Sequence, residues 1–462
     1  PEDFRTRVGF GWGSKTNNYP IQQRWRWGDG YYYPFQDTYP ELARADVEAE
    51  RARGKEIMPT SSVEYFGMYR FARNSYGPLV DPGMIQREVL IWKEEWDQMR
   101  KITESAAEAL ERKNRALERK AKRLPGGRPL EELLARPRHS GPGEDWDGVL
   151  FKPDTYPERF CYNSSFQDYY VWKLHELVKR TGLAAIYLDQ QLYACVNPEH
   201  GCGYIDYKGE WAGQGNVFAM REMAKRIYIV FCQLNGRAPQ IMWHCSQQMV
   251  IPAMSFCTIY FDGEKYTSPN HTRSILNHEF YSAFLTEEVM QVQHMGKPFG
   301  FVADFLPEIN MAAARGLPVK SPTLATTRDM MGLLMINDSH LDGLGHVYHP
   351  ALVDQIVGAR LSFPLDKMKV VYYWEPGSGV AVSPGSVKFI LHYGSQRALL
   401  ILFNWGDETV LAEAALDRAR LGVAGGGLHA TDVLTGERME TRGHTLKADL
   451  LPRDFRMFEV KW

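Results

Sequence analysis

The chain has 462 residues, of which 44% are hydrophobic and 24% charged. This composition excludes a disordered or fibrous protein and leaves room for two domains with a sizeable core. The 54 Lys and Arg residues nearly balance the 56 Asp and Glu residues, so no basic surplus indicates nucleic acid as a partner. No apolar run approaches the roughly 18 residues of a membrane span. The 12 Trp and 24 Tyr residues offer flat apolar faces with a polar edge, which suits the surface of a sugar.

The chain begins at Pro1 and shows no charged-then-apolar signal segment. We expect that a leader was removed or that the sequence starts within a longer polypeptide. A secreted or periplasmic location is expected, with a cytoplasmic one as the alternative. The six cysteines are too sparse for a disulfide framework. Around Cys195, His200 and Cys202, a zinc site, a loop disulfide and free thiols all remain open, although we expect neither a metal nor a cofactor.

Residues 1 to about 150 form an irregular first region. Its start is rich in Gly and aromatic residues, and a helix followed by a strand is predicted between residues 41 and 63. A charged helical insertion is predicted near residues 84–140, because Lys, Arg and Glu of mixed sign are typical of a solvated helix face. Partner binding by this helix is the alternative.

Residues from about 150 to 365 repeat one pattern, a helix followed by a short apolar strand that ends on polar residues. Continuous apolar strands that alternate with helices indicate a parallel sheet covered on both faces. The fold class is therefore α/β, most simply a (β/α)8 TIM-type barrel over residues 1–365. A doubly wound open sheet is the alternative, although no phosphate-binding Gly motif opens a helix. Seven strands are predicted, at residues 7–12, 56–63, 183–189, 240–245, 256–262, 299–304 and 333–337. An eighth strand is expected at residues 148–153 or upstream of Pro1.

From about Lys369 the pattern changes to alternating strands without helices. Short strands separated by Gly, Asn and Asp turns are typical of an antiparallel sandwich. We therefore expect a small antiparallel β-sandwich over residues 366–462. A structural role is expected for it, and carbohydrate binding is the alternative.

Polar residues stand at the carboxyl ends of the predicted strands, which is where the active sites of barrel enzymes lie. One acid at a strand end is unremarkable, because Asp also begins turns. Polar residues that recur at the ends of four strands favour a shared site. The residues at these ends are Asp189 and Gln190, Trp243 and His244, Asp262 and Glu264, Asp304, and, after the last strand, Asp338 and His340.

Hydrolysis of a glycosidic bond needs two carboxyl groups, one to protonate the leaving oxygen and one to attack or to activate water. Asp189 follows an apolar strand and should be held rigidly, which suits a nucleophile. Glu264 follows Gly263 and has a longer side chain, which suits a general acid/base, and Asp262 is the alternative for that role. Repulsion between neighbouring carboxylates would raise the pKa of one of them, as an acid at neutral pH requires.

The remaining strand-end residues are predicted to line a sugar subsite, with Trp243 as a stacking platform and His244 as a hydrogen-bonding group. For these two, a core tryptophan and a structural histidine are the alternatives. The other predicted subsite residues are Gln190, Asp304, Asp338 and His340.

Other chemistries are less well supported, since the sequence has neither a GxSxG elbow nor an HExxH motif. A mononuclear metal site would take the ligands Asp189, His244, Asp262 and Asp304, and stays an alternative. The other alternative function is that of a barrel protein that binds carbohydrate without cleaving it. The expected partner is a carbohydrate substrate, and the oligomeric state is left open.

Several segments between about Arg159 and Trp462 resemble bacterial glycoside-hydrolase-like proteins grouped near glycoside hydrolase family 123. They also resemble, distantly, the barrel α-N-acetylgalactosaminidases and the α-galactosidase clan. The segments that carry the resemblance are IYLDQQ, MWHCS, YFDGEKY, FGFVADFLP, LLILFNWGDETV and ATDVLTGE.

The resemblance implies a catalytic barrel with a C-terminal β-sandwich that removes sugars from polysaccharides or glycoproteins. In such families an Asp on the fourth strand and a Glu or Asp about two strands later do the chemistry. These positions correspond to Asp189 and to Glu264 or Asp262. Family 123 itself uses an adjacent Asp-Glu pair together with the acetamido group of the substrate. Gln190 follows Asp189 here, which argues against that substrate-assisted mechanism.

Overall fold

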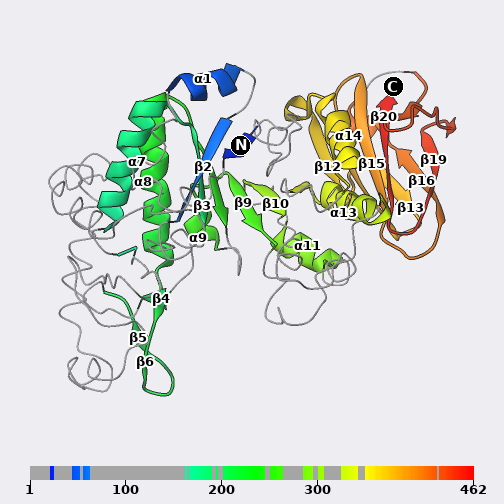
Figure 1. The fold of residues 1–462 in the computed structure, drawn as a ribbon. Coiled ribbons are helices and arrows are strands. Elements are labelled where there is room, and N and C mark those ends of the chain that lie inside the picture. The colour runs from blue at the N-terminus through cyan, green and yellow to red at the C-terminus, as the bar shows by residue number, and fades with distance from the viewer. Residues whose placement is uncertain are drawn as a thin grey trace. The chain divides into compact units, whose positions relative to one another are not determined.

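The computed structural model describes two compact units, one within Gln23–Thr258 and one that includes Ile259–Trp462. Both units are drawn in Figure 1. The predicted strand at 7–12, the charged insertion near 84–140 and the segment 148–153 lie outside the described residues. The structure describes residues 21–24, 44–52, 56–62, 162–163, 166–189, 194–195, 201–244, 250–263, 285–294, 300–305, 324–341, 349–423 and 426–462.

The unit within Gln23–Thr258 contains three parallel strands in the order β2, β3, β8. Helices α7 and α8 pack against each other beside these strands (Figure 1). Short two-residue strands form two small antiparallel pairs, β4 with β7 and β5 with β6. The elements are β1 (Ile21–Arg24), which crosses the boundary between the units, α1 (Arg44–Ala52), β2 (Glu56–Ser62), α7 (Phe166–Thr181), β3 (Ala185–Asp189), β4 (Ala194–Cys195), β5 (Tyr204–Ile205), β6 (Trp211–Ala212), β7 (Gln214–Gly215), α8 (Val217–Asn235), β8 (Gln240–His244) and α9 (Ile251–Met254).

The connection between helix α7 and strand β3 is short, and its backbone groups are hydrogen-bonded. Gly182 follows the helix with φ 71°, a left-handed conformation that glycine adopts readily, and its N–H donates to the carbonyl of Val178 at 2.7 Å. The side-chain amide of Asn235, at the end of α8, donates to the carbonyl of Leu183 at 2.6 Å. These contacts hold the start of β3 in place.

A buried ion pair joins α7 to α8. The guanidinium of Arg226 lies 2.8 Å from the carboxylate of Asp168, and the two side chains are 2% and 4% exposed. Arg226 also donates to the side-chain oxygen of Gln167 at 2.9 Å. Removing one partner would leave a charge in the apolar interior, so the pair strongly couples the two helices.

The unit that includes Ile259–Trp462 starts with three parallel strands in the order β9, β10, β11. One sequence prediction is wrong here, because residues 333–337 are not a strand: they fall in the last turn of α13 and the turn after it, and the strand follows at Ser339. The elements of this region are β9 (Ile259–Asp262), α11 (Glu287–Gln293), β10 (Val302–Phe305), α13 (Leu324–Ile336), β11 (Ser339–Leu341), α14 (Pro350–Leu361) and the 3-10 turn Leu365–Lys367.

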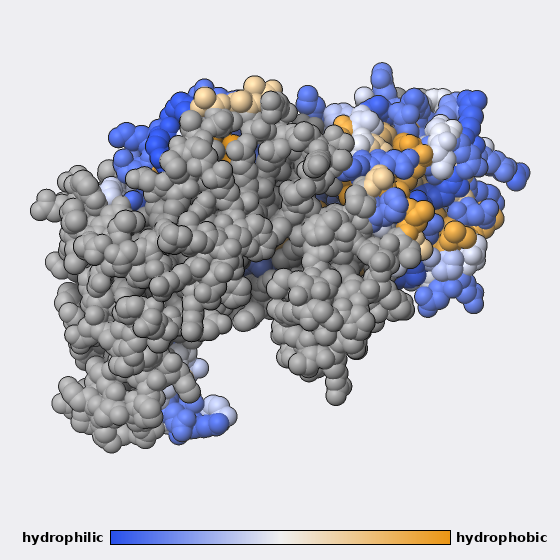
Figure 2. All heavy atoms as spheres, in the orientation of Figure 1, coloured by the Kyte–Doolittle hydropathy of each residue, from blue (hydrophilic) through white to orange (hydrophobic). Residues whose placement is uncertain are grey.

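The end of the chain forms two antiparallel sheets. Their facing side chains make one buried hydrophobic cluster that includes Leu400, Leu402, Ala414, Leu446 and Phe458. Figure 2 shows hydrophilic residues interspersed with hydrophobic ones over the visible surface of this region. The strand orders are β12-β14-β15-β20-β17 and β13-β16-β19-β18, and the elements are β12 (Lys369–Tyr372), β13 (Val380–Ser383), β14 (Val387–Tyr393), β15 (Arg397–Asn404), β16 (Val410–Leu416), α15 (Arg418–Leu421), β17 (His429–Asp432), β18 (Thr441–Arg442), β19 (Thr445–Leu450) and β20 (Phe455–Lys461).

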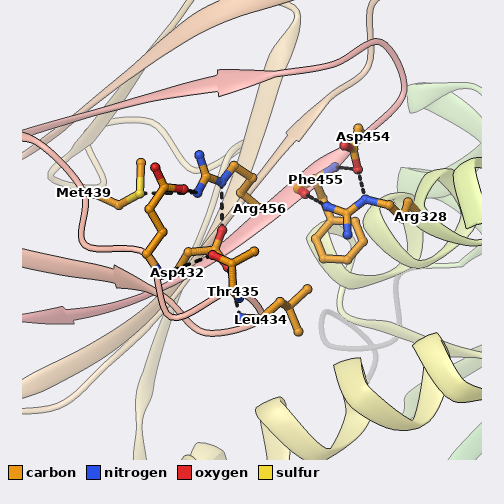
Figure 3. Close-up of polar contacts among 9 residues, drawn as sticks. Arg328, Asp432, Leu434, Thr435, Met439, Asp454, Phe455 and Arg456 are labelled. Carbon is orange, nitrogen blue, oxygen red and sulfur yellow. Dashed lines mark hydrogen bonds and ion pairs between the residues drawn. The ribbon is translucent and has the colours of Figure 1, made fainter.

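Helix α13 packs closely on the five-stranded sheet of this unit (Figure 1). Its Gly332 lies so near β15 that a Cβ atom there would meet the ring of Phe403 at 2.4 Å. Arg328 of the same helix donates to the carboxylate of Asp454 and to the carbonyl of Phe455, at the start of β20 (Figure 3). Within the sheets, Arg456 donates to Asp432 at 2.7 Å. The helix is therefore anchored to the sheet by both packing and charge.

No helix among the described residues is both long and apolar enough to cross a membrane.

Candidate functional site

Two neighbouring parallel strands of the unit within Gln23–Thr258 end on ionisable residues. Strand β3 ends at Asp189, and β8 ends at His244. The backbone of Asp189 pairs in register with Ser62 of β2, so the position of this residue in the sheet is defined. Because the carboxyl ends of parallel strands meet at one edge, Asp189 and His244 belong to the same edge of this unit.

A hydrogen bond joins β3 to β8 beneath this edge. The hydroxyl of Tyr187 lies 2.8 Å from Nδ1 of His244, and the side chains are 1% and 3% exposed. Tyr187 pairs in register with Met242, two residues before His244, so both bonded side chains point to the same face. The rings are tilted, with centroids 6.1 Å apart. His244 is therefore held by a neighbouring strand.

Trp243 stands next to His244 in β8 and so points to the opposite face of the sheet. Its side chain is fully buried and pairs in register with Leu188. This is the environment of a core residue, which agrees with the structural alternative for Trp243. A stacking role for it stays a prediction.

In the other unit, strand β9 ends at Asp262, whose side chain is fully buried. One carboxylate oxygen accepts a hydrogen bond from the hydroxyl of Tyr260, and the other accepts the backbone N–H of Gly263 at 2.7 Å. Tyr260 in turn contacts the ring of His294, at the end of α11. Both oxygens of Asp262 are thus engaged with protein donors, and Gly263 has φ 153°, a backbone conformation that glycine adopts far more readily than other residues.

Strands β3 and β9 carry the same four-residue pattern, which the sequence analysis did not use. Ile186–Asp189 reads IYLD and Ile259–Asp262 reads IYFD. Each tyrosine lies two residues before the aspartate and therefore on the same face of its strand. The hydroxyl of Tyr260 bonds its own aspartate, and the hydroxyl of Tyr187 bonds His244 of the neighbouring strand. The repeated pattern was the signal that could have drawn attention to Tyr187.

Asp304 of β10 and Asp262 of β9 lie on opposite faces of their sheet. Asp304 pairs in register with Phe261, while Asp262 pairs with Phe305. Asp304 also pairs with His340 of β11, so these two residues share a face. Asp304 is fully buried and His340 half-buried. The structure brings Asp304 and His340 together and separates both from Asp262.

Asp338 belongs to a buried network rather than to a strand end. It lies in the turn between α13 and β11 with φ 53°, and its carboxylate accepts the hydroxyl of Tyr372 at 2.8 Å. Burial raises the pKa of Asp338, but the positive fields of His392, His340 and Arg360 and the hydrogen bond from Tyr372 outweigh it, so the pKa lies below its usual value. Burial lowers the pKa of Arg360 in the same network, against the opposing field of Asp338.

Several predicted residues lie outside the described part of the chain. These include Gln190, Glu264 and His200, and the side chain of Asp189 is likewise not described. Cys202 is buried and takes part in no disulfide: its thiol donates to Asn216 at 3.2 Å. The proposed loop disulfide to Cys195 is therefore not formed.

The donors proposed for a mononuclear metal site do not converge within the unit that includes Ile259–Trp462. Asp262 and Asp304 point to opposite faces, so they cannot bind one ion together. Across the described residues, no three His, Cys, Asp or Glu side chains are grouped as metal ligands would be. Asp262 and Asp304 therefore do not fit a metal site that uses both of them as ligands.

No protein-family model matches the sequence, and no curated protein matches it. The chain is similar to an Anoxybacillus α-amylase, with 8% identity over 96% of this chain and 87% of that one and a TM-score of 0.49. It is similar to a GH30 endoxylanase from Clostridium papyrosolvens, with 10% identity over 98% and 96% of the two chains and a TM-score of 0.42. A GH27 β-L-arabinopyranosidase from Geobacillus stearothermophilus shares 13% identity over 67% and 64%, with a TM-score of 0.39. All three TM-scores are below 0.5, so these likenesses establish neither a family nor an activity.

Proposed function

We propose that the chain is a glycoside hydrolase of the retaining type, with Asp189 as nucleophile and Glu264 as general acid/base. The substrate class is a polysaccharide or the glycan of a glycoconjugate. The proposal rests on the chemistry of two carboxyl groups, one of which attacks the anomeric carbon while the other protonates the leaving oxygen. It needs no metal and no cofactor.

The observation that carries the proposal is the way apolar parallel strands end. Three of them, β3, β8 and β9, have ionisable last residues, namely Asp189, His244 and Asp262. Burying an ionisable group is costly unless it is hydrogen-bonded or serves in binding or catalysis. The carboxyl edge of a parallel sheet is also where ligands bind. His244 and Asp262 are both hydrogen-bonded at these ends.

The contacts of Asp262 favour Glu264 for the acid/base role. Both oxygens of Asp262 already accept hydrogen bonds from the protein, and the side chain has no exposed surface. A general acid must instead hold a proton within reach of the leaving oxygen. We assign Asp262 to holding the backbone N–H of Gly263, the residue before Glu264.

A turnover screen tests the proposal. The wild type, Asp189→Asn and Glu264→Gln are compared on aryl α- and β-glycosides, including galactosides and N-acetylgalactosaminides, and on polysaccharides. Glu413→Gln provides the control, because its partly exposed carboxylate pairs with Lys447 in the antiparallel sheets. We expect release by the wild type and the control, a loss of at least 1,000-fold in Asp189→Asn, and retention of anomeric configuration in the first product seen by NMR.

Each result bears on one part of the proposal. Turnover that persists in Glu264→Gln and falls in Asp262→Asn would move the acid role to Asp262. Glycan binding without turnover by the wild type, unchanged in both carboxamide variants, would replace the enzyme with a carbohydrate-binding protein.

A further inference from the structure

We propose that the antiparallel sheets of the unit that includes Ile259–Trp462 carry a saccharide subsite, in which a sugar ring stacks on the indole of Trp374. The inference goes beyond the proposed function, because Trp374 takes no part in hydrolysis and binding at this subsite does not require it. It assigns a ligand and a place to the carbohydrate-binding alternative for residues 366–462.

The indole of Trp374 rests on a ring that is itself held in place. Trp374 follows strand β12, and its ring lies nearly parallel to that of Tyr372, with centroids 4.5 Å apart and an interplanar angle of 16°. Tyr372 is 1% exposed, and its hydroxyl donates to the carboxylate of Asp338 at 2.8 Å. Trp374 itself is half-buried. The stack covers one face of the indole and leaves the other face and the edge for a ligand.

A second tyrosine fixes the orientation of the indole. The ring of Tyr373 meets that of Trp374 edge to face, with centroids 4.8 Å apart. The hydroxyl of Tyr373 donates to the side-chain oxygen of Asn337 at 3.2 Å and accepts from the amide of Gln291 at 3.3 Å. Burial raises the pKa of Tyr373 well above its usual value, so the hydroxyl keeps its proton at neutral pH. A ring held in this way loses little conformational freedom when a ligand binds.

The polar groups around Tyr373 include both hydrogen-bond donors and an acceptor. The ammonium of Lys388 lies over the ring of Tyr373, 5.3 Å from its centroid, and 3.0 Å from one carboxylate oxygen of Glu287. The amide of Gln291 donates to the other oxygen of Glu287 at 3.2 Å. The side chains of Glu287 and Lys388 are 36% and 22% exposed, so a ligand can reach both of them.

This combination matches a neutral sugar better than a charged ligand. The apolar CH surface of a pyranose ring packs on an aromatic face, and its hydroxyls both donate and accept hydrogen bonds. An anion would be repelled by Glu287, and a cation by Lys388. Because these two charges already pair with each other, neither is left to attract an ion. The ligand class is therefore a neutral polysaccharide or glycan chain.

Oxidative footprinting of the wild-type protein tests the subsite without any substitution. Hydroxyl radicals oxidise accessible indoles, and trypsin then releases Trp374 in peptide 370–388 and Trp405 in peptide 398–418. Trp405 is the internal control, because it is also half-buried but has the guanidinium of Arg453 over its ring. The probes are soluble starch, xylan and galactomannan, with polygalacturonate as the anionic comparison. We expect at least one neutral polysaccharide to lower the oxidation of Trp374 and to leave that of Trp405 unchanged.

Affinity electrophoresis in gels that contain the protecting polysaccharide measures the binding itself. Trp374→Ala should weaken the binding about tenfold or more, as is common when a central aromatic anchor is removed. Trp374→Phe should lose less, because a flat ring remains for stacking. Trp405→Ala is the matched control and should bind as the wild type does.

The results that would overturn the inference are distinct from those that bear on hydrolysis. An unprotected Trp374 with every neutral polysaccharide would overturn it, as would equal losses of binding in Trp374→Ala and Trp405→Ala. Protection by polygalacturonate alone would contradict the neutral ligand. If Trp374 is protected but the turnover screen is silent, the proposed function fails and the subsite stands. If turnover occurs and Trp374 stays unprotected, the subsite fails and the proposed function stands.

Discussion

Asp338 keeps a charge in the interior of the unit that includes Ile259–Trp462, and this charge should stabilise the unit. Asp338→Asn retains the left-handed turn, which Asn tolerates, and an acceptor for Tyr372, but removes the negative charge. We expect the variant to lose about 1.5–3 kcal/mol of unfolding free energy at pH 7. Thermal or urea unfolding measures this, with exposed Asp449→Asn as the control.

The pH dependence of this loss has a definite sign. The pKa of Asp338 is lower in the folded unit than its usual value, so the carboxylate contributes stability that is fully present above the usual Asp pKa. That contribution disappears as the pH falls through the lowered pKa. The wild type and Asp338→Asn should therefore converge in acid. A difference that stays constant from pH 7 to pH 3 would contradict the charge argument.

At the scale of elements, the packing of α13 on β15 predicts opposite effects for two glycines. Gly332→Ala would place a Cβ atom 2.4 Å from the ring of Phe403, which costs about 1–3 kcal/mol despite the better helix propensity of Ala. Gly358→Ala, on the exposed side of α14, meets nothing within 4 Å and should stabilise by about 0.5–1 kcal/mol. Urea unfolding of the two variants checks this, and a stabilising Gly332→Ala would contradict the close contact.

The ion pair between α7 and α8 should be far stronger than pairs on the surface. Asp168→Ala leaves the guanidinium of Arg226 buried without its carboxylate and is expected to cost about 3–5 kcal/mol. Glu48→Ala breaks only the exposed pair with Arg44 and should change stability by at most about 1 kcal/mol. Equal effects of the two substitutions on unfolding of the unit within Gln23–Thr258 would refute this contrast.

Strands flanked by turn residues were predictable, whereas one fully apolar segment was not. The pattern placed strands at 183–189, 240–245 and 256–262, and the structure has β3, β8 and β9 there, within three residues at each end. The run that ends at Ile336 is apolar on all sides, and this pattern predicts a strand. It is a helix buried between neighbours, and periodicity cannot distinguish a buried helix from a buried strand.

At the scale of the whole molecule, the sequence identified strand-end residues but not which face each one occupies. The face depends on register between strands distant in sequence, which separates Asp304 from Asp262 and Trp243 from His244. Partners such as Tyr187 for His244 depend on the same long-range pairing. In the described part of the chain, one unit has the parallel strands β2, β3 and β8 and the other has β9, β10 and β11; their closure into a barrel stays a prediction.

If Asp189 is the nucleophile of a retaining glycosidase, the reaction passes through a covalent glycosyl-enzyme. A 2-deoxy-2-fluoro glycoside of the sugar released in the screen should trap it. Tryptic cleavage after Arg180, Lys208, Arg237 and Lys265 places Asp189 in peptide 181–208, and Asp262 and Glu264 together in peptide 238–265.

Mass spectrometry of the trapped protein is thus the most direct measurement. We expect one added fluorosugar, located by fragmentation at Asp189 in peptide 181–208. A label in peptide 238–265, or an enzyme that turns over the parent glycoside with retention yet carries no label at Asp189, would contradict it.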